Sequence, residues 1–225
     1  MEDPEIIITE DGSHSLKLNA INEHYHSTHG AISESRHVFI ESGLQKVLEE
    51  EGSLLNILEI GFGTGLNALL SLAESSKTAI SVNYTAIEPF PVSEKIWGKL
   101  NYHALIGDKR AGEWYSSIHN CPWEVETDIM KGFTLLKHKC QLQDYNSFEA
   151  KFGLIFFDAF APDIQPELWT DEIFQKIAGI TVQGGVFVTY SAKGSVRRAL
   201  QNAGFRMERL PGPKGKREML RGMRL

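Results

Sequence analysis

Two short stretches of the sequence combine residue types that suit ligand binding and proton transfer. The first, "LEIGFGTGLN" (residues 58–67), places the acid Glu59 before three glycines spaced two residues apart. The second, "LIFFDAFAPDIQPELW" (residues 154–169), ends an apolar run with the carboxylate Asp158. A loop that only turns the chain more commonly uses Gly, Asn or Ser. The position of Asp158, directly after a core strand, therefore indicates that its carboxylate has a functional role.

The glycines follow an apolar strand and open a predicted helix, a context in which backbone N–H groups approach a ligand closely. The dinucleotide fingerprint would need Gly or Ala at position 66, where Leu66 stands. An acid two residues before G-x-G-x-G instead resembles the S-adenosylmethionine (SAM) loop of class I methyltransferases. A tight structural turn is the alternative. The residues of this stretch that are predicted to bind or support SAM are Glu59, Gly61, Gly63, Gly65 and Asn67.

Two further acids are predicted to contact SAM. Glu88 ends the second strand, 23 residues after Gly65, near the ~20-residue spacing at which an acid accepts ribose hydroxyls in related folds. Asp144 stands where class I methyltransferases often carry an acidic or polar residue near the adenine. A purely structural role, such as turn capping by Glu88, is the alternative for each.

Asp158 is the candidate catalytic residue. In a doubly wound sheet its strand should neighbour the glycine-loop strand, which brings the carboxylate close to the sulfonium methyl. A primary amine is mostly protonated at neutral pH, since alkylamines titrate near ~10.4. A carboxylate within reach orients the amine and favours loss of its proton. Class I enzymes that methylate nitrogen often carry an acid followed by prolines and aromatics here. The candidates for substrate contact are therefore Phe160, Pro162 and Trp169, with core packing as the alternative for both aromatics.

The pattern of apolar residues around these sites alternates between the spacing of strands and the spacing of helices. Strands are predicted at 54–60, 79–87, 153–160 and 184–191, and helices at 66–75, 92–102, 171–177 and 195–203. Such alternation predicts an α/β fold with a doubly wound, mostly parallel sheet covered on both faces. A hairpin is expected at residues 5–18 and an antiparallel hairpin at 205–225, while 125–142 is β-rich and less regular. We expect a single domain, with residues 1–50 (hairpin, loop and a helix at 35–50) as an extension of a 51–225 core.

Composition indicates an ordinary globular protein, with 42% hydrophobic and 23% charged residues. No run approaches the ~18 apolar residues of a membrane span, and "MEDPEIIITEDG" lacks the features of a secretory signal. Two cysteines make neither a disulfide framework nor a metal cluster. These features favour a cytoplasmic protein without a membrane partner.

The segment "NEHYHSTHGAISESRH" (residues 22–37) holds four histidines, His24, His26, His29 and His37, without cysteine partners or regular helical spacing. We therefore expect no metal site. The segment is predicted instead to fold over the SAM and substrate pocket.

The net charge of −6 conceals a strong asymmetry along the chain. From Lys193 onward ten basic residues face two acidic ones, a net of +8, which leaves −14 for the preceding 192 residues. Such segregation indicates a basic patch for an anionic partner such as nucleic acid, with a solvated face as the alternative. The candidates for phosphate contact are Lys193, Arg197, Arg198, Lys214, Lys216 and Arg217.

Several longer stretches resemble the methyltransferase domain of the MnmC family, in the same order along the chain. They are residues 26–44, 57–70, 158–170, 184–205 and 212–222. The resemblance implies SAM-dependent N-methylation of the 5-aminomethyl group on the wobble uridine of tRNA, often 2-thiolated, with Asp158 as the catalytic or orienting acid. MnmC continues into an FAD-dependent domain whose sequence is not found here. The resemblance therefore implies a stand-alone methyltransferase without FAD, whose substrate upstream tRNA-modifying enzymes supply.

Two other kinds of protein are compatible with parts of the sequence. One is a small-molecule methyltransferase or an aminopropyltransferase of the same fold, although the latter is expected to carry a "GGGDG"-like loop. The other is a non-catalytic tRNA-binding module. The combination of an intact glycine loop with Asp158 argues against a module, and the basic C-terminal segment argues against a small-molecule enzyme.

Overall fold

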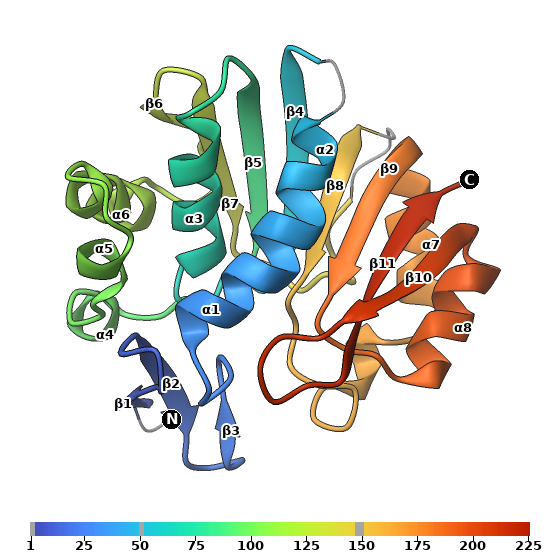
Figure 1. Cartoon of the computed structure of the whole chain (residues 1–225), viewed down its shortest axis with the longest axis horizontal. Helices are drawn as coiled ribbons and strands as arrows, with labels where there is room; N and C mark the ends of the chain where they lie inside the picture. The colour runs from blue at the N-terminus through green and yellow to red at the C-terminus, as the bar shows by residue number, and fades with distance from the viewer. Residues whose placement is uncertain (1–2, 50–51, 147–150) are drawn as a thin grey trace.

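The centre of the protein is a twisted sheet whose inner strands run parallel. The structure, a computed structural model, describes residues 3–49, 52–146 and 151–225, and in this part the large sheet has the order β10-β11-β9-β8-β4-β5-β7-β6 (Figure 1). The parallel strands are β9 (Thr181–Thr189), β8 (Phe152–Phe157), β4 (Leu54–Ile60), β5 (Ser81–Ile87) and β7 (Phe133–His138). The antiparallel edge strands are β6 (Thr127–Met130), β10 (Phe205–Pro211) and β11 (Glu218–Arg224). The predicted fold class and C-terminal hairpin are confirmed.

Helices cover both faces of this sheet, and the inner strands are apolar on both sides for that reason. Successive side chains of a strand point to opposite faces. On β8, Leu154 and Phe156 belong to one buried cluster with residues of α3 (Leu66–Ser75) and α6 (Ala111–Asn120). Ile155 and Phe157 belong to a second cluster, with residues of α7 (Asp171–Ile180) and α8 (Gly194–Asn202).

A small N-terminal sheet lies beside the carboxyl ends of the central strands (Figure 1). The predicted hairpin is its main part, with β1 (Glu5–Ile8) antiparallel to β2 (His14–Leu18), and a short third strand, β3 (Glu23–His24), was not predicted. Asn101 fastens this sheet to the core, because its side chain accepts from the His14 N–H at 2.8 Å and donates to the Gly12 carbonyl at 2.9 Å.

The first long helix begins before the predicted residue 35. It comprises α1 (Ala31–Ser35), a π-helical stretch (Arg36–Leu44) and α2 (Gln45–Leu48). The turn between β1 and β2 satisfies its first N–H groups: Ser13 Oγ accepts from Ala31 at 3.1 Å, and Asp11 Oδ2 accepts from Ser33 at 2.9 Å. These caps are about 20 residues away in sequence, so no local capping motif marks the helix start.

Three other elements differ from the prediction. The helix expected at 92–102 is two single turns, α4 (Glu94–Trp97) and α5 (Tyr102–Leu105). Gly98 ends the first turn, and the Asn101 side chain is hydrogen-bonded to the N-terminal sheet. Helix α6 was not predicted, since its sequence "AGEWYSSIHN" buries only four side chains and is otherwise polar. The irregular region at 125–142 resolves into β6 and β7. Within the described residues no helix is long and apolar enough to cross a membrane.

Candidate active site

A cavity of about 520 Å³ opens where the loops after β4, β5 and β8 meet. The carboxyl ends of such strands, beside the change in strand order, are where doubly wound folds bind ligands. The volume lies within the ~300–1,000 Å³ range of cofactor and small-molecule sites. Residues 23–28 of the N-terminal segment form another wall, together with Tyr190 and Lys216 from the C-terminal part of the chain. The segment predicted to fold over the pocket therefore does line it.

The glycine loop takes backbone conformations that other residues rarely adopt, with φ of +88° at Gly61, +49° at Gly63 and +72° at Gly65. A Cβ at Gly61 would lie 2.5 Å from the carbonyl oxygen of Asp158, so glycine is needed for β4 and β8 to end this close together. Gly61 and Gly63 line the cavity, whereas Gly65 is the N-cap of α3. The positive φ values and the contacts that a Cβ would make at Gly61 and Gly63 explain why glycine occupies these two positions of the cavity wall.

Glu59 and Asp158, which end neighbouring strands, are joined by the side-chain amide of Asn67. Asn67 Nδ2 lies 2.9 Å from Glu59 Oε1 and 2.8 Å from Asp158 Oδ2, and its two hydrogens allow both bonds. Glu59 is fully buried and does not line the cavity. Burial raises the pKa of Glu59 well above its usual range, the Asn67 bond opposes this, and the Asp158 charge adds to it. Burial therefore favours the neutral form of Glu59, and its Oε1 anchors Asn67.

Asp158 presents its carboxyl to the cavity at the end of β8, directly beside β4 as predicted. Burial, and after it the Glu34 charge, raise the pKa of Asp158, the Asn67 hydrogen bond and the Lys216 charge lower it, and together they leave this pKa at about 7. A carboxyl of this kind changes protonation state near neutral pH, as a group that accepts a proton during turnover should.

Glu88 lies on the cavity wall, and its carboxylate supports the loop beneath it. Its oxygens accept from the Gly63 N–H at 3.0 Å and the Phe90 N–H at 2.8 Å. Glu88 thus caps a turn and also faces the cavity, so turn capping and contact with the SAM ribose are compatible roles for it. Asp144 is exposed and outside the cavity lining, where Gln141 and Leu142 from the same segment are found. Its predicted contact with adenine stays a prediction.

The predicted substrate-side residues divide between cavity and core. Phe160 lines the cavity and packs edge-on against Tyr25, with ring centroids 5.4 Å apart. Trp169 is buried beside Phe157, with centroids 4.8 Å apart, and its indole N–H donates to the Phe160 carbonyl at 2.8 Å. Trp169 and Pro162 lie outside the cavity lining, so Trp169 positions Phe160 from the core.

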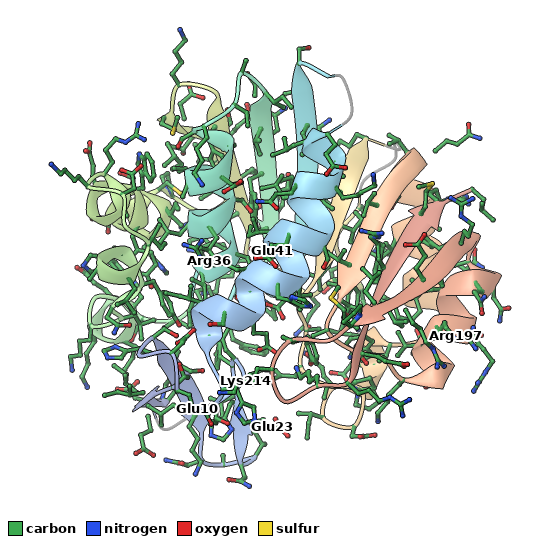
Figure 2. All side chains as sticks on the ribbon, in the orientation of Figure 1. Glu10, Glu23, Arg36, Glu41, Arg197 and Lys214 are labelled. Atoms are coloured by element: carbon green, nitrogen blue, oxygen red, sulfur yellow. The ribbon has the colours of Figure 1, made fainter. Side chains whose placement is uncertain are left out.

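Half of the six predicted phosphate-contact residues are engaged by acids. Lys193 pairs with Asp163, Lys214 with Glu10 at 2.7 Å, and Lys216 with Glu34 at 2.7 Å. Figure 2 shows Lys214 beside Glu10, with Arg197 on α8 away from both. Among the described residues no acid forms an ion pair with the remaining three, which are Arg197, Arg198 and Arg217. Their predicted contact with phosphate stays a prediction, while Lys216 lines the cavity.

The histidines of the N-terminal segment go to separate partners. His26 is buried and lines the cavity, His29 pairs with Glu10 at 2.9 Å, and a His37 ring nitrogen lies 2.8 Å from the Pro211 carbonyl. Within the described residues no three His, Cys, Asp or Glu side chains gather as a metal site would require.

Three cavity residues, Tyr25, Glu34 and Tyr190, were not predicted as site residues. Tyr190 carried a usable signal, because it directly follows a core strand at the same edge of the sheet as Asp158. Tyr25 and Glu34 lie in the segment predicted to fold over the pocket, but no local pattern identified them individually, since their place depends on how that segment folds back over the sheet.

Comparisons with known proteins agree with this geometry. Residues 131–224 match a family described as S-adenosyl-L-methionine-dependent methyltransferase. The chain is 30% identical over 212 residues to the "tRNA 5-methylaminomethyl-2-thiouridine biosynthesis bifunctional protein MnmC" of Pseudomonas fluorescens. This alignment covers 88% of this chain and 32% of that protein. It is 30% identical to the MnmC of Marinomonas sp., over 99% of this chain and 34% of that protein. The chain thus spans about a third of the length of these curated relatives.

A crystal structure of MnmC2 from Aquifex aeolicus superposes with a TM-score of 0.81 at 25% sequence identity, covering 99% of this chain and 70% of that one. The sheet, the glycine loop and the cavity define a class I SAM-dependent methyltransferase. Within that class the chain is similar to the MnmC proteins of Pseudomonas fluorescens and Marinomonas sp. and to MnmC2 of Aquifex aeolicus.

Proposed function

We propose that the protein is a SAM-dependent N-methyltransferase that converts 5-aminomethyl-(2-thio)uridine at the tRNA wobble position to 5-methylaminomethyl-(2-thio)uridine. The observation that carries the proposal is the placement of Asp158 in the cavity, beside the glycine loop and bonded to Asn67 at 2.8 Å. The names of the relatives supply the substrate, since they are enzymes of 5-methylaminomethyl-2-thiouridine biosynthesis in tRNA. Such an enzyme would act in the cytoplasm, on tRNA that other modifying enzymes have given an aminomethyl group.

Gly61 and Gly63 would hold SAM by close backbone approach, with Glu88 accepting from its ribose hydroxyls. When bound, SAM supplies the methyl group of its sulfonium. The lone pair of the neutral amine forms the new N–C bond, and the sulfur keeps the electron pair of the broken S–C bond. Glu59 supports the site through Asn67 rather than by contact.

Asp158 would accept a hydrogen bond from the substrate amine, orient its lone pair and take up the proton that the amine loses. One oxygen, Oδ2, is held by Asn67, which leaves Oδ1 for the amine. Most of the rate gain would come from holding the nitrogen in line with the methyl group. Phe160 and Tyr25 offer ring surfaces for a base, a contact worth ~1–3 kcal/mol in single-strand binders.

The unpaired basic residues would contact the phosphates of tRNA. Arg197, Arg198 and Arg217 are the better candidates, because Lys193 and Lys214 are already paired with acids at the surface. Binding through such contacts weakens steeply as salt rises.

The test uses purified protein, SAM with a labelled methyl group, and tRNA isolated from cells that make the aminomethyl nucleoside but do not methylate it. Nucleoside analysis of the product should show the label in 5-methylaminomethyl-uridine, and tRNA lacking the aminomethyl group should remain unlabelled. SAM binding is measured separately by calorimetry. Binding of SAM without transfer to any tRNA would favour a small-molecule methyltransferase. Failure to bind SAM would overturn the reading of the glycine loop.

A further inference from the structure

Glu34 and Lys216 form an ion pair within the cavity wall, although they are 182 residues apart in sequence. Lys216 Nζ lies 2.7 Å from Glu34 Oε1, and the Glu34 side chain is only 9% exposed. Its other oxygen, Oε2, accepts from the Ser27 N–H at 2.7 Å, so the carboxylate is held at both ends. Exposed ion pairs contribute little because solvent screens them and the side chains stay mobile. This pair is fixed in place.

Tyr190 connects the pair to the strand end that carries Asp158. Lys216 Nζ lies 3.8 Å from the centroid of the Tyr190 ring, a cation–π contact. The Tyr190 hydroxyl donates to the carbonyl of Ala159 at 2.8 Å, and Ala159 is the residue after Asp158. The ammonium group is thereby positioned by two side chains, and one of them is bonded to the loop that holds the candidate catalytic carboxyl.

Both charges act on Asp158, and they act in opposite directions. The Glu34 carboxylate disfavours a charge on Asp158, whereas the Lys216 ammonium favours it. The side chains that act on Asp158 are Glu34, Asn67 and Lys216, and the Asp158 charge in turn acts on Glu59, Tyr84 and Tyr190. Within this set Lys216 is the cation.

We propose that the Glu34–Lys216 pair is a positioning element that sets the protonation of Asp158, with Lys216 holding it as a carboxylate and Glu34 limiting that effect. The role assigned to Asp158 rests on the proposed function, but its titration does not. Loss of Lys216 leaves the Glu34 charge without its partner in the same cavity wall, so Asp158 should bind its proton more tightly. Loss of the Glu34 charge leaves Lys216 unopposed, so Asp158 should release its proton more easily.

The test follows the Asp158 carboxyl directly, by ¹³C NMR of protein labelled at the aspartate side-chain carboxyl carbon. The signal is assigned by its loss in Asp158→Asn. Lys216→Met should move the titration midpoint upward by about one pH unit, and Glu34→Gln should move it downward by a similar amount. Lys216→Arg should stay near the wild-type midpoint, and the double variant Glu34→Gln/Lys216→Met should lie between the two single variants.

The matched control is the neighbouring pair Lys214–Glu10, which also measures 2.7 Å but whose residues are exposed and outside the cavity lining. Lys214→Met and Glu10→Gln should leave the Asp158 midpoint unchanged, whatever their effect on tRNA affinity. Shifts of the same sign in Glu34→Gln and Lys216→Met would overturn the proposal, because a merely structural role predicts no opposition. Absence of any shift in both would overturn it as well.

A second arm tests the consequence for turnover. The acid limb of the pH–rate profile for methyl transfer should follow the NMR midpoint, upward in Lys216→Met and downward in Glu34→Gln. If the wild-type protein methylates no tRNA, the proposed function fails, and the NMR midpoints still decide the role of the pair. If the midpoints move as expected and the acid limb does not, Asp158 is tuned by the pair but takes no proton in the rate-limiting step.

Discussion

Asn67 Nδ2 lies 2.8 Å from Asp158 Oδ2, so an amide at the start of α3 fixes the carboxyl that ends β8. The same nitrogen lies 2.9 Å from Glu59 Oε1; Glu59 and Asn67 are buried, whereas Asp158 is half-buried at the cavity. The orientation of the candidate catalytic group therefore depends on a residue of the SAM loop helix, which couples the cofactor side of the cavity to the acceptor side.

Replacement of Asn67 by Ala should both destabilise the protein and change its pH profile. The buried carboxyl of Glu59 and the half-buried one of Asp158 lose a donor, which costs about 1–3 kcal/mol of unfolding free energy. Because the Asn67 bond lowers the pKa of Asp158, its loss should move the acid limb of methyl transfer to higher pH. Urea denaturation and a pH–rate profile measure the two effects. Asn120→Ala is the control, since that amide bonds only Ser116 at the surface. Equal stability in the two variants would contradict the bridging role.

Replacement of Asp158 by Asn should reduce methyl transfer by about 10²–10⁴-fold, the usual contribution of a positioned acid or base. The substituted amide keeps the shape of the side chain, so SAM affinity should change little. Single-turnover transfer to tRNA and calorimetric SAM binding test this. Asp163→Asn, an exposed acid of the same loop, should leave the rate unchanged. A full rate in Asp158→Asn would remove this residue from the mechanism.

The raised pKa of Asp158 also predicts how stability depends on pH. Burial raises it from 3.8 to about 7, so between these values the folded protein binds more protons than the unfolded chain. Stability from this group is therefore fully present below about pH 4 and is lost as pH rises towards about 7. Asp158→Asn should gain in unfolding free energy over the wild type as pH rises through this window, with a constant difference above it. Denaturation at pH 5, 6, 7 and 8 checks the trend. A difference that shrinks as pH rises would contradict it.

The glycine loop offers a matched pair of substitutions. Gly61 and Gly107 have similar φ, +88° and +84°, so alanine at either meets the same backbone strain of about 1–2 kcal/mol. Only at Gly61 would the new Cβ lie 2.5 Å from a carbonyl oxygen, that of Asp158, whereas at Gly107 nothing lies within 4 Å. Gly61→Ala should therefore be the more destabilising and should weaken SAM binding. Urea denaturation and calorimetry compare them. Equal losses of unfolding free energy in Gly61→Ala and Gly107→Ala would mean that β4 and β8 can move apart without loss of stability.

The unpaired arginines predict a salt-dependent effect on tRNA affinity. Arg198→Glu should weaken tRNA binding and reduce the salt slope by about one, as expected for loss of one phosphate contact. Filter binding between about 50 and 200 mM salt measures both quantities. Lys77→Glu is the control, because Lys77 follows the far end of α3 from the cavity and pairs with Glu74. If both variants bind alike at all salt concentrations, the C-terminal charge is a solvated face.

The sequence was informative where local pattern and tertiary structure agree. Apolar strands followed by glycines or an acid predicted β4, β8, the glycine loop and the placement of Asp158. Contacts that join distant segments left no local signal. The start of α1 depends on Ser13 and Asp11, and the engagement of Lys216 depends on Glu34. Charge counting predicted the basic segment but not that Lys193, Lys214 and Lys216 are paired with acids elsewhere in the chain.

The cavity wall combines Tyr25 and Glu34 from near the beginning of the chain with Tyr190 and Lys216 from near its end. During synthesis on a ribosome, the glycine loop and Asp158 emerge well before Lys216 does. The binding pocket is thus finished only when the strands on either side of residues 212–217 have paired, as β10 and β11 do. A growing chain that has not yet reached Lys216 would therefore hold an incomplete pocket.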